Sequence, residues 1–260
     1  MNYWLKKCYN DFKDDSWSDV DSYYDFTQLP DSIKQECADN SGFSKRITQI
    51  ENIDYWRNQC FRGVYKKNNL VFVTMYKCAS STYMSYLEKQ KWEKIQFSEI
   101  DFNSMYVFGF IMDPLKRRIK GITEILCECY NNNYNDIMQI LKNDNFCAFL
   151  NNISLMDSHT TPYWILFGDQ LKKIHWIPLE FYTHNETFTC FQQICKKHNV
   201  HLDNNVRFEK FHVSNQDKKK VFVAVKQLLQ NQCFGDLYLL YSHDLKFYRE
   251  LLDKHKRIVI

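Results

Sequence analysis

A lysine and three consecutive hydroxyl residues follow an apolar run near residue 70. The run Asn69–Met75 is rich in β-formers and shows no helical spacing, which predicts a strand buried on both faces. A short polar loop follows, and a helix is predicted over 82–91. A loop between a buried strand and a helix gathers backbone N–H groups at the positive end of the helix dipole, where phosphate binds. The residues expected to hold a phosphate are Lys77, Cys78, Ala79, Ser80, Ser81 and Thr82.

The same residues fit two other interpretations. Ser and Thr are common N-caps, so the hydroxyl residues could simply begin an ordinary helix. A P-loop nucleotide kinase acting on ATP shares the strand–loop–helix arrangement. That class needs the ending Gly-Lys-Ser/Thr, whose hydroxyl helps to hold Mg²⁺, and the loop here contains no glycine. The kinase is therefore disfavoured.

Two further strands are predicted along the chain. The run 105–111 is apolar and ends at Met112-Asp113-Pro114, where Asp suits a helix N-cap and Pro the first turn. A third strand is predicted over 173–178. Helices are expected between about 136 and 167, over 186–198, 217–230 and 234–252. Strands that alternate with helices predict an α/β fold with a central parallel sheet flanked by helices and a P-loop-like strand-loop-helix phosphate site.

Composition limits the classes of partner. The chain has 260 residues, is 45% hydrophobic and carries a formal charge of +3, so any anion site must be local, and neither nucleic acid nor a membrane is an expected partner. We find no signal peptide or membrane-spanning run and expect a cytoplasmic protein from a phage or another microbe. The ten cysteines are irregularly spaced, which predicts reduced thiols and no metal site. Residues 1–60 are interpreted as an extension that packs on the core or lines an acceptor cleft, and 61–260 as one domain.

Six segments, taken in order, resemble the sulfotransferase superfamily, particularly its carbohydrate-type branch. Each segment alone is unspecific, but all six occur in the family's order over about residues 68–252, which chance explains poorly. The segments are VFVTMYKCASSTYMSYL, FGFIMDPLKRRIKGI, DSHTTPYWILFG, KIHWIPLEFYTHNETFTCFQQICKKHNV, FHVSN and LYLLYSHDLKFYREL.

The resemblance implies a site for the sulfate donor PAPS, or its product PAP, that needs no metal. Lys77 matches the lysine of the family's 5′-phosphosulfate loop and is expected to act in catalysis as well as binding. Met112 replaces the arginine that normally precedes Asp-Pro, and Lys120 replaces a serine farther along the helix. We expect Lys120, with Arg117, to hold the 3′-phosphate, and Arg118 to be a solvated cation. Tyr163 stands where the branch usually has glutamine.

The acceptor hydroxyl needs a base, for which the resemblance offers His159 in its Asp-x-His segment. A histidine in such a turn also commonly has only a structural role. Glu99 and Asp101, just before the second strand, are alternative bases. In the late loop, His212 and Ser214 are expected to contact the nucleotide. The other histidines, including His175 and His198, and the tryptophans Trp92, Trp164 and Trp176, are interpreted as packing or capping residues.

Two activities follow from the resemblance. The first is transfer of a sulfuryl group from PAPS to a hydroxyl acceptor, which the carbohydrate-type branch implies is a carbohydrate. The second is a weakened relative that binds PAPS, PAP or a glycan without turnover, as the changes at Met112 and Lys120 would allow.

Overall fold

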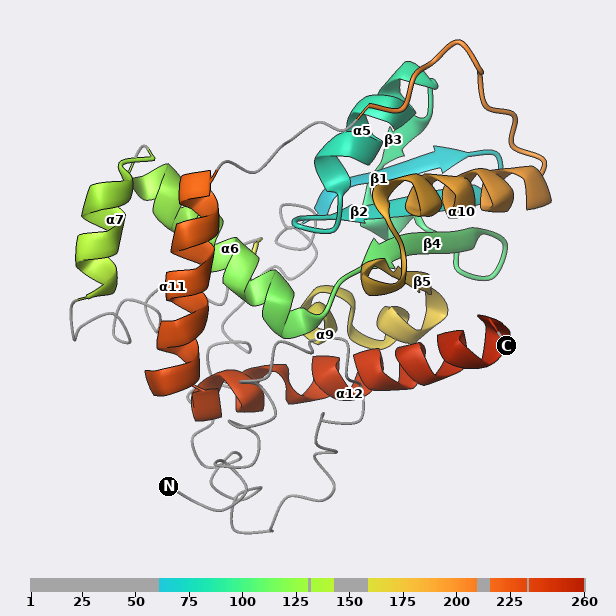
Figure 1. The fold of residues 1–260 in the computed structure, drawn as a ribbon. Coiled ribbons are helices and arrows are strands. Elements are labelled where there is room, and N and C mark those ends of the chain that lie inside the picture. Colours follow the sequence, from blue (N-terminus) through green and yellow to red (C-terminus); the bar gives the residue numbers. More distant parts are fainter. Residues whose placement is uncertain (1–60, 131, 143–158, 210–215, 233, 260) are drawn as a thin grey trace, which may run out of the picture.

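A mixed five-stranded sheet forms the centre of the protein (Figure 1). The computed structural model describes residues 61–130, 132–142, 159–209, 216–232 and 234–259. Residues 1–60, interpreted from sequence as an extension, lie outside the described residues. The strands are ordered β3-β1-β2-β4-β5. Their bounds are β1 Phe61–Lys67, β2 Leu70–Met75, β3 Glu93–Ile95, β4 Tyr106–Ile111 and β5 His175–Pro178.

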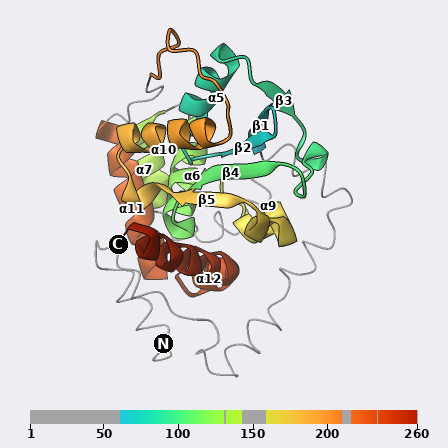
Figure 2. The same ribbon diagram turned by 90° about the vertical axis from the view of Figure 1, so that its right-hand side faces the viewer.

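Apolar side chains cover both faces of the sheet. Every residue of β2 is buried, and successive residues point to opposite faces, so Phe72 belongs to one core cluster and Val71 and Val73 to the other. Figures 1 and 2 show α5 (Ser80–Lys89) and α10 (His184–Lys197) over one face, and α9 (Tyr163–Phe167) with α12 (Phe234–Val259) over the other. The three strands predicted from apolar runs are β2, β4 and β5, which run parallel to one another.

The expectation of a wholly parallel sheet is wrong, because β1 and β3 run antiparallel to their neighbours. Lys67 pairs with Leu70, which leaves Asn68 and Asn69 as a two-residue hairpin turn. Asn68 has φ 56, a left-handed conformation that asparagine tolerates better than most residues. The sequence did not predict β1 because its polar residues interrupt any apolar run.

The helices predicted over 82–91, 186–198, 217–230 and 234–252 are present, with small shifts at their ends. The expected helix over 82–91 is α5, that over 186–198 is α10, and the last two are α11 (Gln216–Gln232) and α12. Between 136 and 167 the structure describes α7 (Tyr134–Leu141) and α9, while 143–158 lie outside the described residues. The described residues also form short 3₁₀ helices at Phe97–Glu99, Gly168–Lys173 and Leu179–Phe181.

Helix α6 (Pro114–Cys129) begins at the carboxyl end of β4 and leads away from the sheet. The predicted start is confirmed, because the Asp113 carboxylate accepts from the Lys116 N–H at 2.9 Å and Pro114 lies in the first turn. Helices α7, α11 and α12 pack against α6. Throughout the described part of the chain, every helix is too short or too polar to cross a bilayer.

Candidate functional site

A tight loop connects β2 to α5, as the sequence predicted. Lys77 and Ala79 have φ values of 67 and 60, so two residues other than glycine adopt the left-handed conformation within one short turn. This conformation costs about 1 kcal/mol or more per residue, and such outliers cluster at functional sites. The N-cap of α5 is Ala79, which offers no side-chain hydrogen bond. The interpretation of Ser80, Ser81 and Thr82 as N-caps is therefore wrong.

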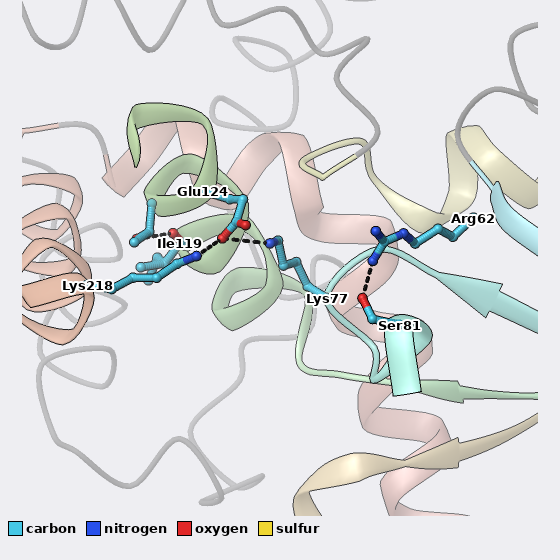
Figure 3. A network of polar contacts seen from close by, with 7 residues as sticks. Arg62, Lys77, Ser81, Ile119, Glu124 and Lys218 are labelled. Carbon is cyan, nitrogen blue, oxygen red and sulfur yellow. Dashed lines mark hydrogen bonds and ion pairs between the residues drawn. The ribbon is translucent and has the colours of Figure 1, made fainter. Parts of the chain in front are cut away.

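The Lys77 side chain reaches from this loop toward α6 (Figure 3). Its Nζ lies 3.1 Å from Oε2 of Glu124, and Nζ of Lys218 on α11 pairs with the same oxygen. Burial lowers the pKa of Lys77, although the negative charge of Glu124 and the hydrogen bond to it act in the opposite direction. Burial alone would raise the pKa of Glu124, but the hydrogen bond from Lys218 and the charge of Lys77 outweigh it and lower the pKa to about 2. The two ammonium groups therefore share one ionised carboxylate.

The hydroxyl residues differ in exposure. Ser80 and Thr82 are buried, whereas Ser81 is partly exposed and its Oγ accepts a hydrogen bond from Nη1 of Arg62. The Arg62 guanidinium also lies 5.2 Å from the ring centroid of Tyr76. Arg62 belongs to β1, the strand that sequence reasoning missed, and the hairpin carries it to the loop. The adjacent asparagines of the turn were the signal that could have found it.

Arg117 ties the loop to the segment before α9. Its guanidinium donates to the carbonyl of Tyr76 at 3.2 Å and to that of Thr161 at 2.5 Å, and it lies 4.9 Å from the ring centroid of Tyr163. The side chain is only 1% exposed. These contacts give Arg117 a structural task at the loop, whereas the sequence assigned it to a phosphate. Arg118, expected to be solvated, is instead buried at 4% exposure.

Lys120 lies one turn beyond Arg117 and close to the loop. Burial is the main cause of its lowered pKa, and the charges of Lys116 and Lys77 act in the same direction. Among the described residues, no carboxylate lies within ion-pair distance of the Lys120 ammonium group. Lys120 thus lies near enough to Lys77 for the charge of Lys77 to affect it, and it forms no salt bridge within the described chain.

Two of the three departures from the sulfotransferase pattern, Met112 and Tyr163, contact each other. The Tyr163 hydroxyl donates to the carbonyl of Met112 at 2.9 Å, and the Met112 N–H approaches that hydroxyl at 3.4 Å. The Cys78 sulfur lies 3.7 Å from the same oxygen. Burial raises the pKa of both the Tyr163 phenol and the Cys78 thiol, so both remain protonated. Tyr163 therefore fastens the end of β4 beneath the loop.

His159 packs beside the loop through Tyr76. The ring centroids are 4.4 Å apart and the rings meet edge to face. Gly121 on α6 allows this segment to approach, because a Cβ at that position would lie 2.5 Å from the carbonyl oxygen of His159. Asp157, the acidic residue of the same Asp-x-His segment, lies outside the described residues.

The alternative bases lie elsewhere. Glu99 and Asp101 precede β4 and so lie at the amino ends of the parallel strands, whereas the loop and α6 leave the carboxyl ends. Glu99 accepts from the Gln96 N–H at 2.5 Å in a capping box. Of the three bases suggested by the sequence, His159 is the one that lies beside the loop. His212 and Ser214 lie outside the described residues.

The other expectations concern packing. His198 is the C-cap of α10, as proposed, and the ring of His175 lies 5.7 Å from that of Tyr106. Trp92 and Trp176 are buried, and Trp164 packs partly buried against the core.

The described cysteines Cys78, Cys127, Cys190 and Cys195 are unpaired, and the described residues form no cluster that could hold a metal ion.

Comparisons of the chain with protein-family models, with curated proteins and with solved structures found no match. The resemblance to sulfotransferases therefore rests on the sequence segments themselves. The structure adds the relative placement of the described parts of those segments, which exclude FHVSN and residues 157–158.

Proposed function

We propose that this protein binds PAPS and transfers its sulfuryl group to a hydroxyl group of an acceptor. The resemblance to the carbohydrate-type branch points to a carbohydrate acceptor. One observation carries the proposal: β2 and β4 are adjacent and parallel, so the Lys77 loop and the first turns of α6 leave the same edge of the sheet. The resemblance assigns these two segments to the 5′-phosphosulfate and the 3′-phosphate of one nucleotide. Ligands of open α/β sheets bind at the carboxyl ends of the strands.

Local charge supports an anionic ligand at this edge. The charges of Lys116 and Lys77 both act to lower the pKa of Lys120, so three lysines lie near one another here. Left-handed residues within a turn, as at Lys77 and Ala79, are a feature of loops whose amides converge on anions. Because the net charge of the chain is only +3, this concentration of lysines is local.

The chemistry asks for charge stabilisation and a proton acceptor. In the proposed reaction the acceptor oxygen forms a bond to sulfur while the bond from sulfur to the phosphate oxygen breaks, and PAP leaves with the negative charge. Lys77 is assigned to stabilise that charge. His159 is assigned to take the acceptor proton, a role that contributes about 10²–10⁴-fold in enzymes that use it.

A nucleotide-binding protein without turnover is the second candidate. Met112 favours it, because its buried side chain carries no charge at the position where the family has its phosphate-binding arginine. Arg117 is engaged by backbone carbonyls and would have to leave them to bind a phosphate.

Calorimetric titration with PAP tests the proposal. The wild-type protein should bind PAP, and Lys77→Ala should weaken binding at least about tenfold, since a charged hydrogen bond is worth roughly 1.5–3 kcal/mol. Lys89→Ala, at an exposed position in the last turn of α5, is the matched control and should bind as wild type does. Wild-type protein that binds no PAP would contradict the proposal.

Radiolabelled sulfate transfer then separates the two candidates. A panel of glycans and small alcohols is offered with labelled PAPS, and His159→Ala is compared with wild type. Transfer that is lost in His159→Ala while PAP affinity is kept supports the enzyme. PAP binding without transfer to any acceptor supports the second candidate.

A further inference from the structure

Two lysines from different elements converge on a single carboxylate oxygen. Lys77 comes from the loop after β2 and Lys218 from the first turn of α11, and both pair with Oε2 of Glu124 on α6 (Figure 3). Sequence reasoning singled out neither Glu124 nor Lys218. The three side chains are partly exposed, at 18% for Lys77, 23% for Glu124 and 32% for Lys218, so solvent and solutes reach this junction.

The arrangement is an anion site in which the anion belongs to the protein. Two ammonium groups repel each other and can be held together only around negative charge. Glu124 supplies a single charge, which leaves the group with a net positive charge, and Lys120 lies close enough to add to it. A phosphate group carries a larger negative charge than a carboxylate and offers three oxygens to the same donors.

The order of the lysine side chains also favours a phosphate. A lysine side chain loses rotamer freedom when it is fixed in one position. Because Glu124 already holds both ammonium groups at one point, a phosphate that replaces it there orders no further lysine.

We propose that Lys218 is a phosphate-binding residue of the nucleotide site, and that Glu124 competes with the nucleotide phosphate for the ammonium groups of Lys77 and Lys218. This inference rests on the function proposed above and adds α11 to the elements that form the site. It follows that the affinity for the nucleotide is held below the limit that the two lysines alone would allow.

The test uses variants that should change affinity in opposite directions. We expect Lys218→Ala to weaken PAP binding about tenfold, because a charged hydrogen bond is lost. We expect Glu124→Gln to tighten PAP binding severalfold, because the competing charge is removed from a group of similar size. Lys219→Ala, at the exposed neighbouring position, is the control and should leave PAP affinity unchanged. Calorimetry with PAP on the full chain measures all four proteins.

A purely structural network gives a different pattern. If the ion pairs only held the loop and α11 in place, both Lys218→Ala and Glu124→Gln would weaken PAP binding, and the inference would be overturned. Unchanged affinity in Lys218→Ala would also overturn it. If Glu124→Gln fails to fold, Glu124→Asp carries the second arm, because the shorter carboxylate competes less well and binding should again tighten.

The outcomes separate this inference from the proposed function. Wild-type protein that binds PAP and loses affinity in Lys77→Ala, but not in Lys218→Ala, keeps the proposed function and refutes the role of Lys218. Wild-type protein that binds no PAP refutes the proposed function and this inference with it.

Discussion

Asp244 on α12 anchors the start of α9. One carboxylate oxygen accepts from the Tyr163 N–H at 2.5 Å and the other from the Trp164 N–H at 2.9 Å. The side chain is fully buried, and desolvation raises its pKa to about 7 against the effect of these hydrogen bonds and of Arg117. A buried carboxylate thus holds Tyr163, whose hydroxyl in turn binds the backbone of Met112.

Replacing Asp244 by Asn should destabilise the protein by about 2 kcal/mol. An amide has a single acceptor oxygen, so its NH₂ group would face one of the two backbone N–H groups and leave it without a partner. Urea unfolding measures the change. Asp253→Asn, at an exposed position on the same helix, should have almost no effect, and equal stability of the two variants would contradict this account.

The depressed pKa of Glu124 makes a pH-dependent contribution to stability. Its pKa falls from 4.5 to about 2 on folding, so this contribution is present above the unfolded pKa and is lost as the pH falls from about 4.5 toward 2. We expect the wild type to lose about 1 kcal/mol in this window relative to Glu124→Gln, allowing for partial exposure. Urea unfolding of both proteins across the window measures it. A constant difference between them would contradict the prediction.

At the scale of elements, α6 gathers most of the site. Four residues of α6 are spaced three or four positions apart, which places them on one side of the helix. They are Arg117, Lys120, Gly121 and Glu124. That side faces the carbonyl of Tyr76, the segment at His159 and the Lys77 ammonium group. One helix therefore sets the positions of both the loop lysine and the candidate base.

Gly121→Ala should separate α6 from the His159 segment. The added Cβ would lie 2.5 Å from a backbone oxygen, which cannot move aside as a flexible side chain could. We expect a loss of about 1–3 kcal/mol in stability, despite the better helix propensity of alanine. Thermal and urea unfolding measure it, with Glu128→Ala at an exposed position of α6 as control. A variant as stable as wild type would show that the segment is free to move.

At the scale of the whole molecule, the sheet separates two apolar cores, and the candidate site lies at its carboxyl edge. Tyr83, Phe110 and Phe191 pack on one face, and Phe167, Trp176 and Tyr248 on the other. The two cores hold the sheet on both faces, and Cys78 and Ala79 anchor the loop in them. This arrangement allows a strained loop such as 76–79 to persist.

Backbone amide exchange should reflect this arrangement. We expect the amides of β2 and β4 to exchange slowest, because each of these strands is paired on both sides and covered by both cores. The amides of β3, a three-residue edge strand with Glu93 and Lys94 exposed, should exchange among the fastest of the sheet. Hydrogen exchange followed by mass spectrometry measures both, and faster exchange in β2 than in β3 would contradict the account.

The sequence by itself determined the elements whose signal is local. Apolar runs identified β2, β4 and β5, because strands buried on both faces carry few polar positions. The pair Asp113-Pro114 marked the start of α6, because capping depends on neighbouring residues alone. The loop between β2 and α5, with Lys77 in it, was likewise predicted from adjacent residues alone.

Only the tertiary structure decided which side chains meet. Glu124 and Lys218 lie far from Lys77 along the chain, and nothing in their local sequence distinguishes them from other charged residues on helices. The antiparallel hairpin that brings in Arg62, the burial of Arg117 and Arg118, and the contact between Met112 and Tyr163 likewise depend on how helices pack at the sheet edge. Periodicity records which face of an element is buried, but it carries no information about the partner that buries it.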